Sequence, residues 1–142
     1  MKILVIDSNV VIKWFSPETD TEAADAIRDK HLQDELTLVA PDLLIAEVAN
    51  ILWKKREQVS ETQAIDALFQ IISSGIEFVQ VESLAESAYR LARQHKRSAY
   101  DCFYLALAVS HHCDFITADE RLFNAIAKQE PRVKLLREYS VE

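Results

Sequence analysis

The sequence predicts an α/β domain with a mainly parallel sheet and right-handed crossover connections. Three observations support this fold class. Short aliphatic runs alternate with longer helical segments, and the connections between them are short. The first run, residues 3–6, is apolar throughout, as a strand is when both faces of a parallel sheet are covered. The length of 142 residues, with 49% hydrophobic and 27% charged residues, fits one globular domain over residues 1–142.

Five short segments have the length and composition of strands. In chain order they cover residues 3–6, 36–39, 76–81, 115–117 and 133–136. The first is a continuous aliphatic run, the second is closed by Pro41, and the third alternates between apolar and polar side chains. Because ligands bind outside the carboxyl ends of strands in such sheets, residues that follow the strands are the first candidates for function.

Seven segments have helical patterns. In chain order they cover residues 10–15, 22–32, 42–57, 60–75, 83–95, 98–112 and 119–128. The first ends before Pro17, and Gly75 is expected to end the fourth. Ser60 and Ser83 are each followed three residues later by Gln or Glu, which predicts a capping box at both helix starts.

Glycine is scarce, and this excludes several nucleotide-dependent functions. Gly75 is the only glycine, so neither a Walker-type phosphate loop nor a dinucleotide-binding glycine motif can be formed. Lys and Arg number 16 against 23 Asp and Glu, a formal net charge of -7. Taken alone, this balance argues against electrostatic binding of nucleic acid.

The sequence shows no pattern of export or membrane insertion. Asp7 interrupts the apolar N-terminal run before a signal-peptide core can form, and no run approaches the ~18 apolar residues of a membrane span. Cys102 and Cys113 are too few for a disulfide framework and are compatible with a reducing compartment. We therefore expect a cytoplasmic protein without membrane association.

Two acidic residues follow predicted strands. Asp7 comes directly after the first strand, and Asp119 comes after the fourth, where a helix begins. Both have a structural alternative, because Asp7 can cap the next helix and residues 117–120 spell a capping box. Asp114 lies at the opposite end of the fourth strand, so we expect no functional role for it.

Two further acidic residues lie on apolar helices. Winding residues 43–56 at 100° per residue predicts a mostly buried helix on which Glu47, Asn50 and Lys54 share one polar stripe. Asp101 lies in the first turn of a helix that is apolar on every side, where an ionised carboxylate must be paired, hydrogen-bonded or metal-bound. The alternatives are an exposed helix edge for Glu47 and a capping box with Ser98 for Asp101.

All four acidic side chains can meet in one crevice at the sheet edge. Like charges this close repel by about 4 kcal/mol per pair at roughly 4 Å and an effective dielectric of about 20. Such a cluster either takes up protons or holds a cation. Because the ligands are all oxygen, with no converging His or Cys, Mg²⁺ or Mn²⁺ is favoured over zinc.

Four motifs occur in the order and spacing of a known family. They are Asp7-Ser8-Asn9 after an apolar strand, residues 41–50 (PDLLIAEVAN), residues 98–101 (SAYD) and residues 117–122 (TADERL). With these motifs the chain resembles PIN domains over essentially its full length. It resembles in particular the VapC-like ribonuclease toxins of bacterial and archaeal type II toxin-antitoxin pairs.

The resemblance implies a PIN-like, three-layer fold whose central, mainly parallel five-stranded sheet is flanked by helices. It also implies a Mg²⁺- or Mn²⁺-dependent endoribonuclease that hydrolyses RNA phosphodiester bonds. Asp7, Glu47, Asp101 and Asp119 match the metal-binding and catalytic positions of the family. The metal is expected to activate a water molecule, so no protein nucleophile is needed.

The resemblance also implies supporting residues and partners. Asn9 and Thr117 match polar positions that orient the carboxylates or a bound water, with Asn9 where other members have Ser or Thr. Family members commonly form homodimers, and a cognate antitoxin holds them inactive by inserting its C-terminal segment into the active-site groove. RNA, an antitoxin and a second copy of the chain are therefore the implied partners.

Two groups of basic residues could offset the acidic charge locally. The first, which we take as the RNA contact, consists of Lys13, Lys54, Lys55 and Arg56. The second consists of Arg90, Arg93 and Arg97. A solvated helix end favoured by the helix dipole is the alternative explanation of the first group.

Three other functions are compatible with parts of the pattern. A haloacid-dehalogenase-like phosphatase would use Asp7 as nucleophile, but it usually needs a second Asp where this chain has Asn9. A catalytically silent PIN-like binding module need not keep all four acids. A PIN-like nuclease that processes RNA without an antitoxin would keep them.

Overall fold

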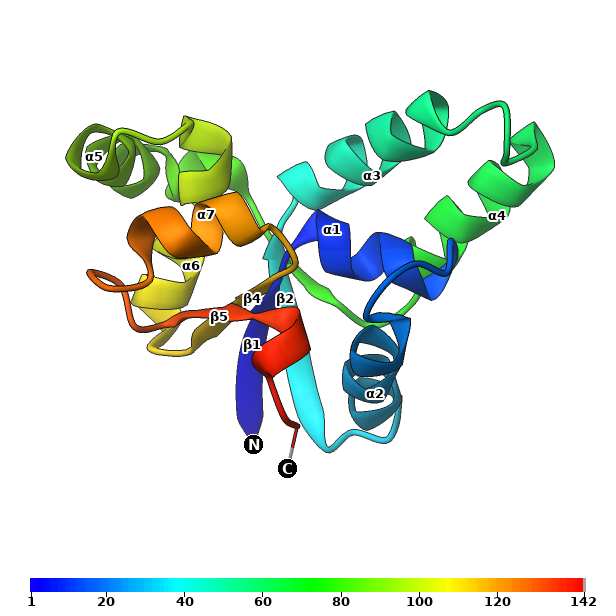
Figure 1. Ribbon diagram of the computed structural model, residues 1–142, viewed down its shortest axis with the longest axis horizontal. Coiled ribbons are helices and arrows are strands. Elements are labelled where there is room, and N and C mark those ends of the chain that lie inside the picture. The colour runs from blue at the N-terminus through cyan, green and yellow to red at the C-terminus, as the bar shows by residue number, and fades with distance from the viewer. Residues whose placement is uncertain (142) are drawn as a thin grey trace.

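A five-stranded, all-parallel sheet forms the centre of the fold in the computed structural model, which describes residues 1–141 (Figure 1). The strands are β1 (Lys2–Ile6), β2 (Leu36–Pro41), β3 (Glu77–Val79), β4 (Asp114–Thr117) and β5 (Val133–Leu135). Their order is β3-β2-β1-β4-β5, and every neighbouring pair is parallel. The predicted α/β class and its sheet are therefore confirmed.

Helices cover the sheet on both sides. They are α1 (Ser8–Val11), α2 (Thr21–Leu32), α3 (Leu43–Lys54), α4 (Glu61–Ile72), α5 (Ala85–His95), α6 (Ala99–His111) and α7 (Glu120–Ile126). In Figure 1, α5 and α6 lie on one side of β1 and β2, and α1 and α2 lie on the other. No helix within residues 1–141 combines the length and the apolar composition that crossing a membrane requires.

Helix α6 is the buried central helix that its apolar sequence predicts. Its buried residues are Cys102, Tyr104, Leu105, Ala106, Leu107 and Ala108. The ring of Tyr104 stacks on that of Phe115 in β4, with 5.5 Å between the ring centroids. The helix contacts β1, β2 and β4, so its position is set by the middle of the sheet. The functional side chains near its N-terminus therefore stand on a rigid support.

Helix α3 is less buried than the sequence predicts. Its buried residues are Leu44, Val48 and Leu52, which follow one another at intervals of four and form a single stripe. The helix packs against α4, α1 and β2, while its outer side stays in solvent, and Trp53 is 58% exposed. The prediction of a mostly buried helix is wrong, because apolar composition alone does not show how many neighbours cover a helix.

The helix starts follow the predicted capping pattern only in part. At Ser60 the capping box is complete, with its hydroxyl accepting from the Gln63 amide and the Gln63 side chain accepting from the Ser60 amide. The box predicted at Ser83 is absent, because its hydroxyl donates to the Gln80 carbonyl in a 3-10 turn and the helix begins later. The box predicted over residues 117–120 is also absent, because Asp119 itself caps α7.

Candidate active site

Asp7 is held at the carboxyl end of β1, next to the end of β4. Because β1 and β4 are paired in parallel, Ile6 lies beside Ile116, and the Asp7 amide donates to the Ile116 carbonyl at 3.1 Å. The Asp7 side chain caps α1 by accepting from the Ser8 amide at 2.8 Å. The residue is 7% exposed, so its carboxylate is almost fully removed from water.

Asn9 and Thr117 form a hydrogen-bond network with Asp7. Thr117 Oγ1 donates to Asp7 Oδ2 at 2.8 Å, and Asn9 Nδ2 lies 3.3 Å from the same oxygen. Asn9 Oδ1 accepts from the Ala118 amide at 2.9 Å, and Thr117 Oγ1 accepts from the Asp119 amide at 3.1 Å. These contacts join the start of α1 to the turn after β4 and fix the orientation of the Asp7 carboxylate.

Glu47 reaches the site from α3, and Tyr104 of α6 orients it. The Tyr104 hydroxyl donates to Glu47 Oε1 at 2.5 Å, a short bond of the charge-assisted kind. This bond lowers the pKa of Glu47, but burial raises it more, so the pKa of Glu47 lies above its usual value. Burial and the nearby charges of Asp7 and Glu47 raise the pKa of the Tyr104 hydroxyl, which therefore stays a proton donor.

Asp101 lies one turn before Tyr104 on α6 and is paired with Arg97. Arg97 Nη2 lies 3.6 Å from Asp101 Oδ2, and both side chains are partly exposed. Burial raises the pKa of Asp101, the Arg97 charge lowers it, and Asp119 raises it; the balance stays above the usual value. The expected capping box is not formed, because the Ser98 hydroxyl accepts from the Tyr100 amide while Asp101 turns to Arg97.

Asp119 lies at the start of α7 and uses its side chain as a helix cap. Oδ1 of Asp119 accepts from the amides of Arg121 at 3.0 Å and Leu122 at 3.1 Å. Its charge is close enough to raise the pKa of Asp101. Asp119 is therefore a helix cap, as the structural alternative expected, and it also lies near Asp101.

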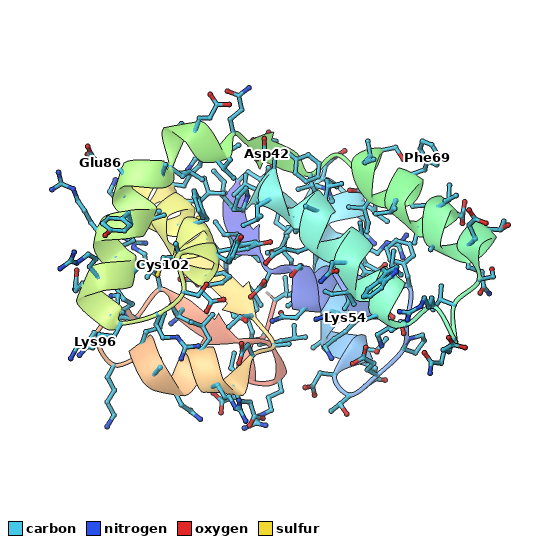
Figure 2. All side chains as sticks on the ribbon, turned by 90° about the horizontal axis from the view of Figure 1, so that it is seen from above. Asp42, Lys54, Phe69, Glu86, Lys96 and Cys102 are labelled. Atoms are coloured by element: carbon cyan, nitrogen blue, oxygen red, sulfur yellow. The ribbon has the colours of Figure 1, made fainter. Side chains whose placement is uncertain are left out.

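The four acidic side chains influence one another at the carboxyl ends of β1 and β4. Burial raises the pKa of Asp7 to about 7, and the negative charges of Glu47 and Asp101 contribute to this rise. Asp101 is the common neighbour of the other three. Its charge also raises the pKa of Glu47, and the charge of Asp119 raises the pKa of Asp101. Figure 2 looks down on this end of the sheet, with Cys102 of α6 and Lys54 of α3 on opposite sides of the central strands.

The carboxylates of Asp7, Glu47, Asp101 and Asp119 are the kind of ligand that a hard divalent cation prefers, but they are not arranged as a complete metal-binding site. Carboxylate oxygens are the ligands that Mg²⁺ and Mn²⁺ prefer. Among the ion pairs within residues 1–141, none involves Asp7 or Glu47, so those charges are not balanced by the protein. The same part of the chain holds no three His, Cys, Asp or Glu side chains already arranged to bind a metal ion.

The basic residues predicted to contact RNA differ in accessibility. Lys13 is only 7% exposed, and its ammonium donates to the Thr19 carbonyl at 2.8 Å. Lys55 Nζ lies 2.9 Å from Glu18 Oε1, and the Arg56 guanidinium lies 4.2 Å from the centre of the Trp53 ring. Lys54, by contrast, is exposed at the end of α3. Lys13 is therefore turned into the protein, contrary to the expectation of a surface contact.

Asn50 is exposed on α3, one turn after Glu47. Tyr104 was not predicted as a functional residue, although its spacing of three from Asp101 places both on one side of α6. Arg97 was grouped with two other arginines because the helix pattern does not show that it pairs with Asp101.

Comparisons with known proteins agree with this architecture. The chain is 31% identical over 124 residues to a ribonuclease VapC3 of Pyrobaculum aerophilum, an alignment that covers 84% of this chain and 91% of the relative. A crystal structure of a protein from Pyrobaculum aerophilum has a TM-score of 0.68 at 21% identity, with 96% of this chain and 85% of that chain covered.

Two toxin-antitoxin structures have a similar fold. A toxin-antitoxin complex from Klebsiella pneumoniae has a TM-score of 0.64 at 23% identity, covering 97% of this chain and 99% of that chain. The VapBC2 structure from Rickettsia felis, bound to a DNA fragment from its promoter, has a TM-score of 0.65 at 12% identity, covering 94% and 96%. The family model of the PIN domain matches residues 4–129. From this match and the VapC3 relative, the chain belongs to the PIN domain family.

Proposed function

We propose that this protein is a divalent-metal-dependent endoribonuclease of the cytoplasm and the toxin of a toxin-antitoxin pair. The observation that carries the catalytic part is the Asp7 carboxylate, which is buried beside the charges of Glu47 and Asp101 without a cationic partner within residues 1–141. A carboxylate in such a place is costly unless it takes up a proton or binds a cation. The ribonuclease relative supports RNA as the substrate.

Asp7, Glu47, Asp101 and Asp119 would hold Mg²⁺ or Mn²⁺. When bound, the ion lowers the pKa of a water molecule and offsets negative charge on the phosphate. The α7 amides occupy Oδ1 of Asp119, and Arg97 lies against Oδ2 of Asp101, so one oxygen of each carboxylate is left for the ion. The Asp7 carboxylate, which Thr117 and Ser8 already orient, would be the fixed ligand around which the others gather.

Glu47, oriented by Tyr104, would accept a proton from the attacking water. The Tyr104 hydroxyl occupies Oε1 of Glu47 at 2.5 Å, which leaves Oε2 to accept a hydrogen bond from water. The raised pKa of Glu47 brings it closer to neutral pH, as suits a group that accepts and returns a proton. Asn9 and Thr117 would keep the carboxyl end of β1 in register with that of β4 during this step.

The RNA contact is proposed for the end of α3. Lys54 is exposed there, and Lys55 and Arg56 follow directly, held by Glu18 and by the Trp53 ring. We leave Lys13 out of this contact because its ammonium is buried against Thr19 and Glu18. Asn50, exposed between Glu47 and Lys54 on the same helix, would contact RNA between the site and this basic end.

An antitoxin and a second copy of the chain are the proposed protein partners. The structural neighbours include a VapBC structure and a toxin-antitoxin complex, which supports an antitoxin. Large apolar side chains are exposed on α3 and α4, and the most exposed of them are Trp53 and Phe69. Apolar surface of this kind is typical of interaction sites. Figure 2 shows Phe69 on α4, far from Cys102 of α6.

The catalytic proposal is tested with purified protein freed of metal and of any partner. Structured RNA should be cleaved with Mg²⁺ or Mn²⁺ and remain intact with EDTA. Asp7→Asn and Asp101→Asn should each lower the cleavage rate by roughly a hundredfold or more, since each removes a proposed ligand. Circular dichroism and thermal unfolding show whether the variants remain folded.

Asp114→Asn is the matched control for these variants. It makes the same chemical change at the opposite end of β4, so cleavage should stay within about twofold of wild type. Cleavage at the wild-type rate by folded Asp101→Asn would contradict the proposed mechanism. RNA binding without cleavage by metal-loaded wild type would favour a binding module instead.

The toxin proposal is tested separately in cells. Expression of the wild-type chain should arrest growth, and expression of Asp7→Asn should not. Co-expression of the product of a small neighbouring reading frame should restore growth. Cleavage in vitro without growth arrest, and without such a neighbour, would favour an RNA-processing nuclease.

A further inference from the structure

Arg97 is a cationic side chain at the acidic site, away from the residues proposed to contact RNA. Its Nη2 lies 3.6 Å from Asp101 Oδ2, and the exposed fractions of the two side chains are 28% and 32%. Among the ion pairs within residues 1–141, this is the one that involves any of Asp7, Glu47, Asp101 and Asp119. The chain therefore places a positive charge beside Asp101, the carboxylate that interacts with Asp7, Glu47 and Asp119.

The backbone around Arg97 is fixed by the end of one helix and the start of the next. Helix α5 ends at His95, and Lys96 adopts a left-handed conformation with a φ of 55°. The Arg97 amide then donates to the Ala92 carbonyl at 3.2 Å, and Ser98 caps α6. Figure 2 shows Lys96 at the end of α5 that approaches α7, opposite the end that carries Glu86. These contacts fix the backbone of Arg97 next to the start of α6, four residues before Asp101.

Arg97 does not use all of its hydrogen-bond donors in its contact with Asp101. The Nε atom of Arg97 is buried and has no hydrogen-bond partner within the described residues. The pair has a single N–O approach of 3.6 Å, without the two parallel hydrogen bonds of a bidentate arginine pair. A partly exposed pair of this kind contributes little stability, so a doubly charged ion can displace it.

We propose that Arg97 is an internal competitor of the divalent cation at Asp101 and so sets the metal concentration at which the site is loaded. This inference rests on the proposed function of the same carboxylates. The guanidinium repels a second cation at the shared carboxylate, and it also lies against Oδ2 of Asp101, an oxygen that the ion could otherwise bind. Removing the charge should therefore strengthen metal binding, although it removes a favourable contact from the protein.

Metal binding is measured directly, by isothermal titration calorimetry and by the electron paramagnetic resonance signal of free Mn²⁺, with metal-depleted protein at pH 8. Arg97→Gln should bind Mn²⁺ about tenfold more tightly than wild type, equivalent to about 1.4 kcal/mol. Arg97→Lys keeps the charge and should stay within about threefold of wild type. A purely structural role for Arg97 would weaken binding or leave it unchanged.

Arg90→Gln is the matched control. Arg90 lies on α5 and pairs with Glu86 over the same spacing of four residues, at 3.7 Å, but both side chains are highly exposed. Its removal changes the net charge of the protein by the same amount as Arg97→Gln, at an arginine that pairs with Glu86 and not with Asp101. The control should bind Mn²⁺ within about twofold of wild type, because exposed charges at a distance are screened.

A second measurement uses the wild-type chain and needs no variant to fold. The Nε–H resonance of Arg97 in a nitrogen-correlated NMR spectrum should shift on titration with Mg²⁺ and saturate with the binding isotherm. An unshifted resonance at saturating Mg²⁺, or equal Mn²⁺ affinity in folded Arg97→Gln, would overturn the inference while leaving the nuclease proposal intact. If wild type does not bind Mn²⁺, or binds it no more tightly than Asp7→Asn does, both this inference and the nuclease proposal are wrong.

Discussion

Substitution of Asp7 by Asn should stabilise this protein at alkaline pH in the absence of divalent ions. The carboxylate is buried, and burial raises its pKa from 3.8 to about 7 in the folded protein. Below about pH 4 the group is protonated in the folded and unfolded states alike and has little effect on stability. As the pH rises to 7 the unfolded state loses its proton and the folded state keeps it, so stability falls, and above pH 7 the full destabilisation is present.

The magnitude follows from these two pKa values. The ionisable Asp7 should lower the free energy of unfolding by roughly 1 to 2 kcal/mol at pH 5 and by about 4 kcal/mol at pH 8. Asn cannot ionise and removes this dependence, but it disturbs the contacts with Asn9 and Thr117. That cost is the same at both pH values. The difference in stability between variant and wild type should therefore shift toward the variant by about 2 to 3 kcal/mol from pH 5 to pH 8.

The assay is urea unfolding followed by far-ultraviolet circular dichroism, on metal-depleted protein at both pH values. Asp114→Asn is the control, and its difference from wild type should change by less than about 0.5 kcal/mol. A difference between Asp7→Asn and wild type that stays constant with pH would refute the reasoning. It would show that the Asp7 carboxylate is hydrated or paired in the folded protein.

The remaining predictions concern proton release, orientation of Glu47 and two local structures. Because the pKa of Asp7 is about 7, Mg²⁺ binding at pH 7 should release about half a proton or more, measured by calorimetry in buffers of different ionisation enthalpy. An identical heat in all buffers would contradict this. Tyr104→Phe removes the 2.5 Å bond to Glu47 and should lower the cleavage rate about tenfold and raise the pH at which cleavage is half-maximal. A pH–rate profile matching wild type would rule out the orienting role. Gly75 has a φ of 87°, so Gly75→Ala should lower the free energy of unfolding by about 1 kcal/mol without changing cleavage. Ser60→Ala, which opens the capping box of α4, should also cost about 1 kcal/mol in urea unfolding. Unchanged midpoints in these two variants would show that neither local structure contributes to stability.

The elements and the strand ends were predictable because they depend on residues close together in the chain. The run of residues 3–6 is apolar on both sides, so it had to be an interior strand, and Asp7 then had to follow at its carboxyl end. The apolar circumference of α6 placed Asp101 at the start of a buried helix. Alternation of strands and helices then made a parallel sheet the consistent arrangement, and the structure confirms it.

The predictions about exposure were less successful for a physical reason. The side chain of Lys13 is long enough to fold back to Thr19 and Glu18, and nothing in its local sequence shows which way it turns. Trp53 is apolar yet exposed, because α4, α1 and β2 cover only part of α3. Burial depends on the number of neighbours that reach a residue, and those neighbours come from other parts of the chain.

The sequence by itself determined the α/β class, the order of the elements and the positions of Asp7, Glu47, Asp101 and Asp119 along them. Only the tertiary structure decided what those carboxylates contact. Tyr104 reaches Glu47 across 57 positions of the chain, and Thr117 reaches Asp7 across 110. Local patterns record the period of a helix or strand, whereas these contacts depend on the packing of α6 against the sheet and on the pairing of β1 with β4.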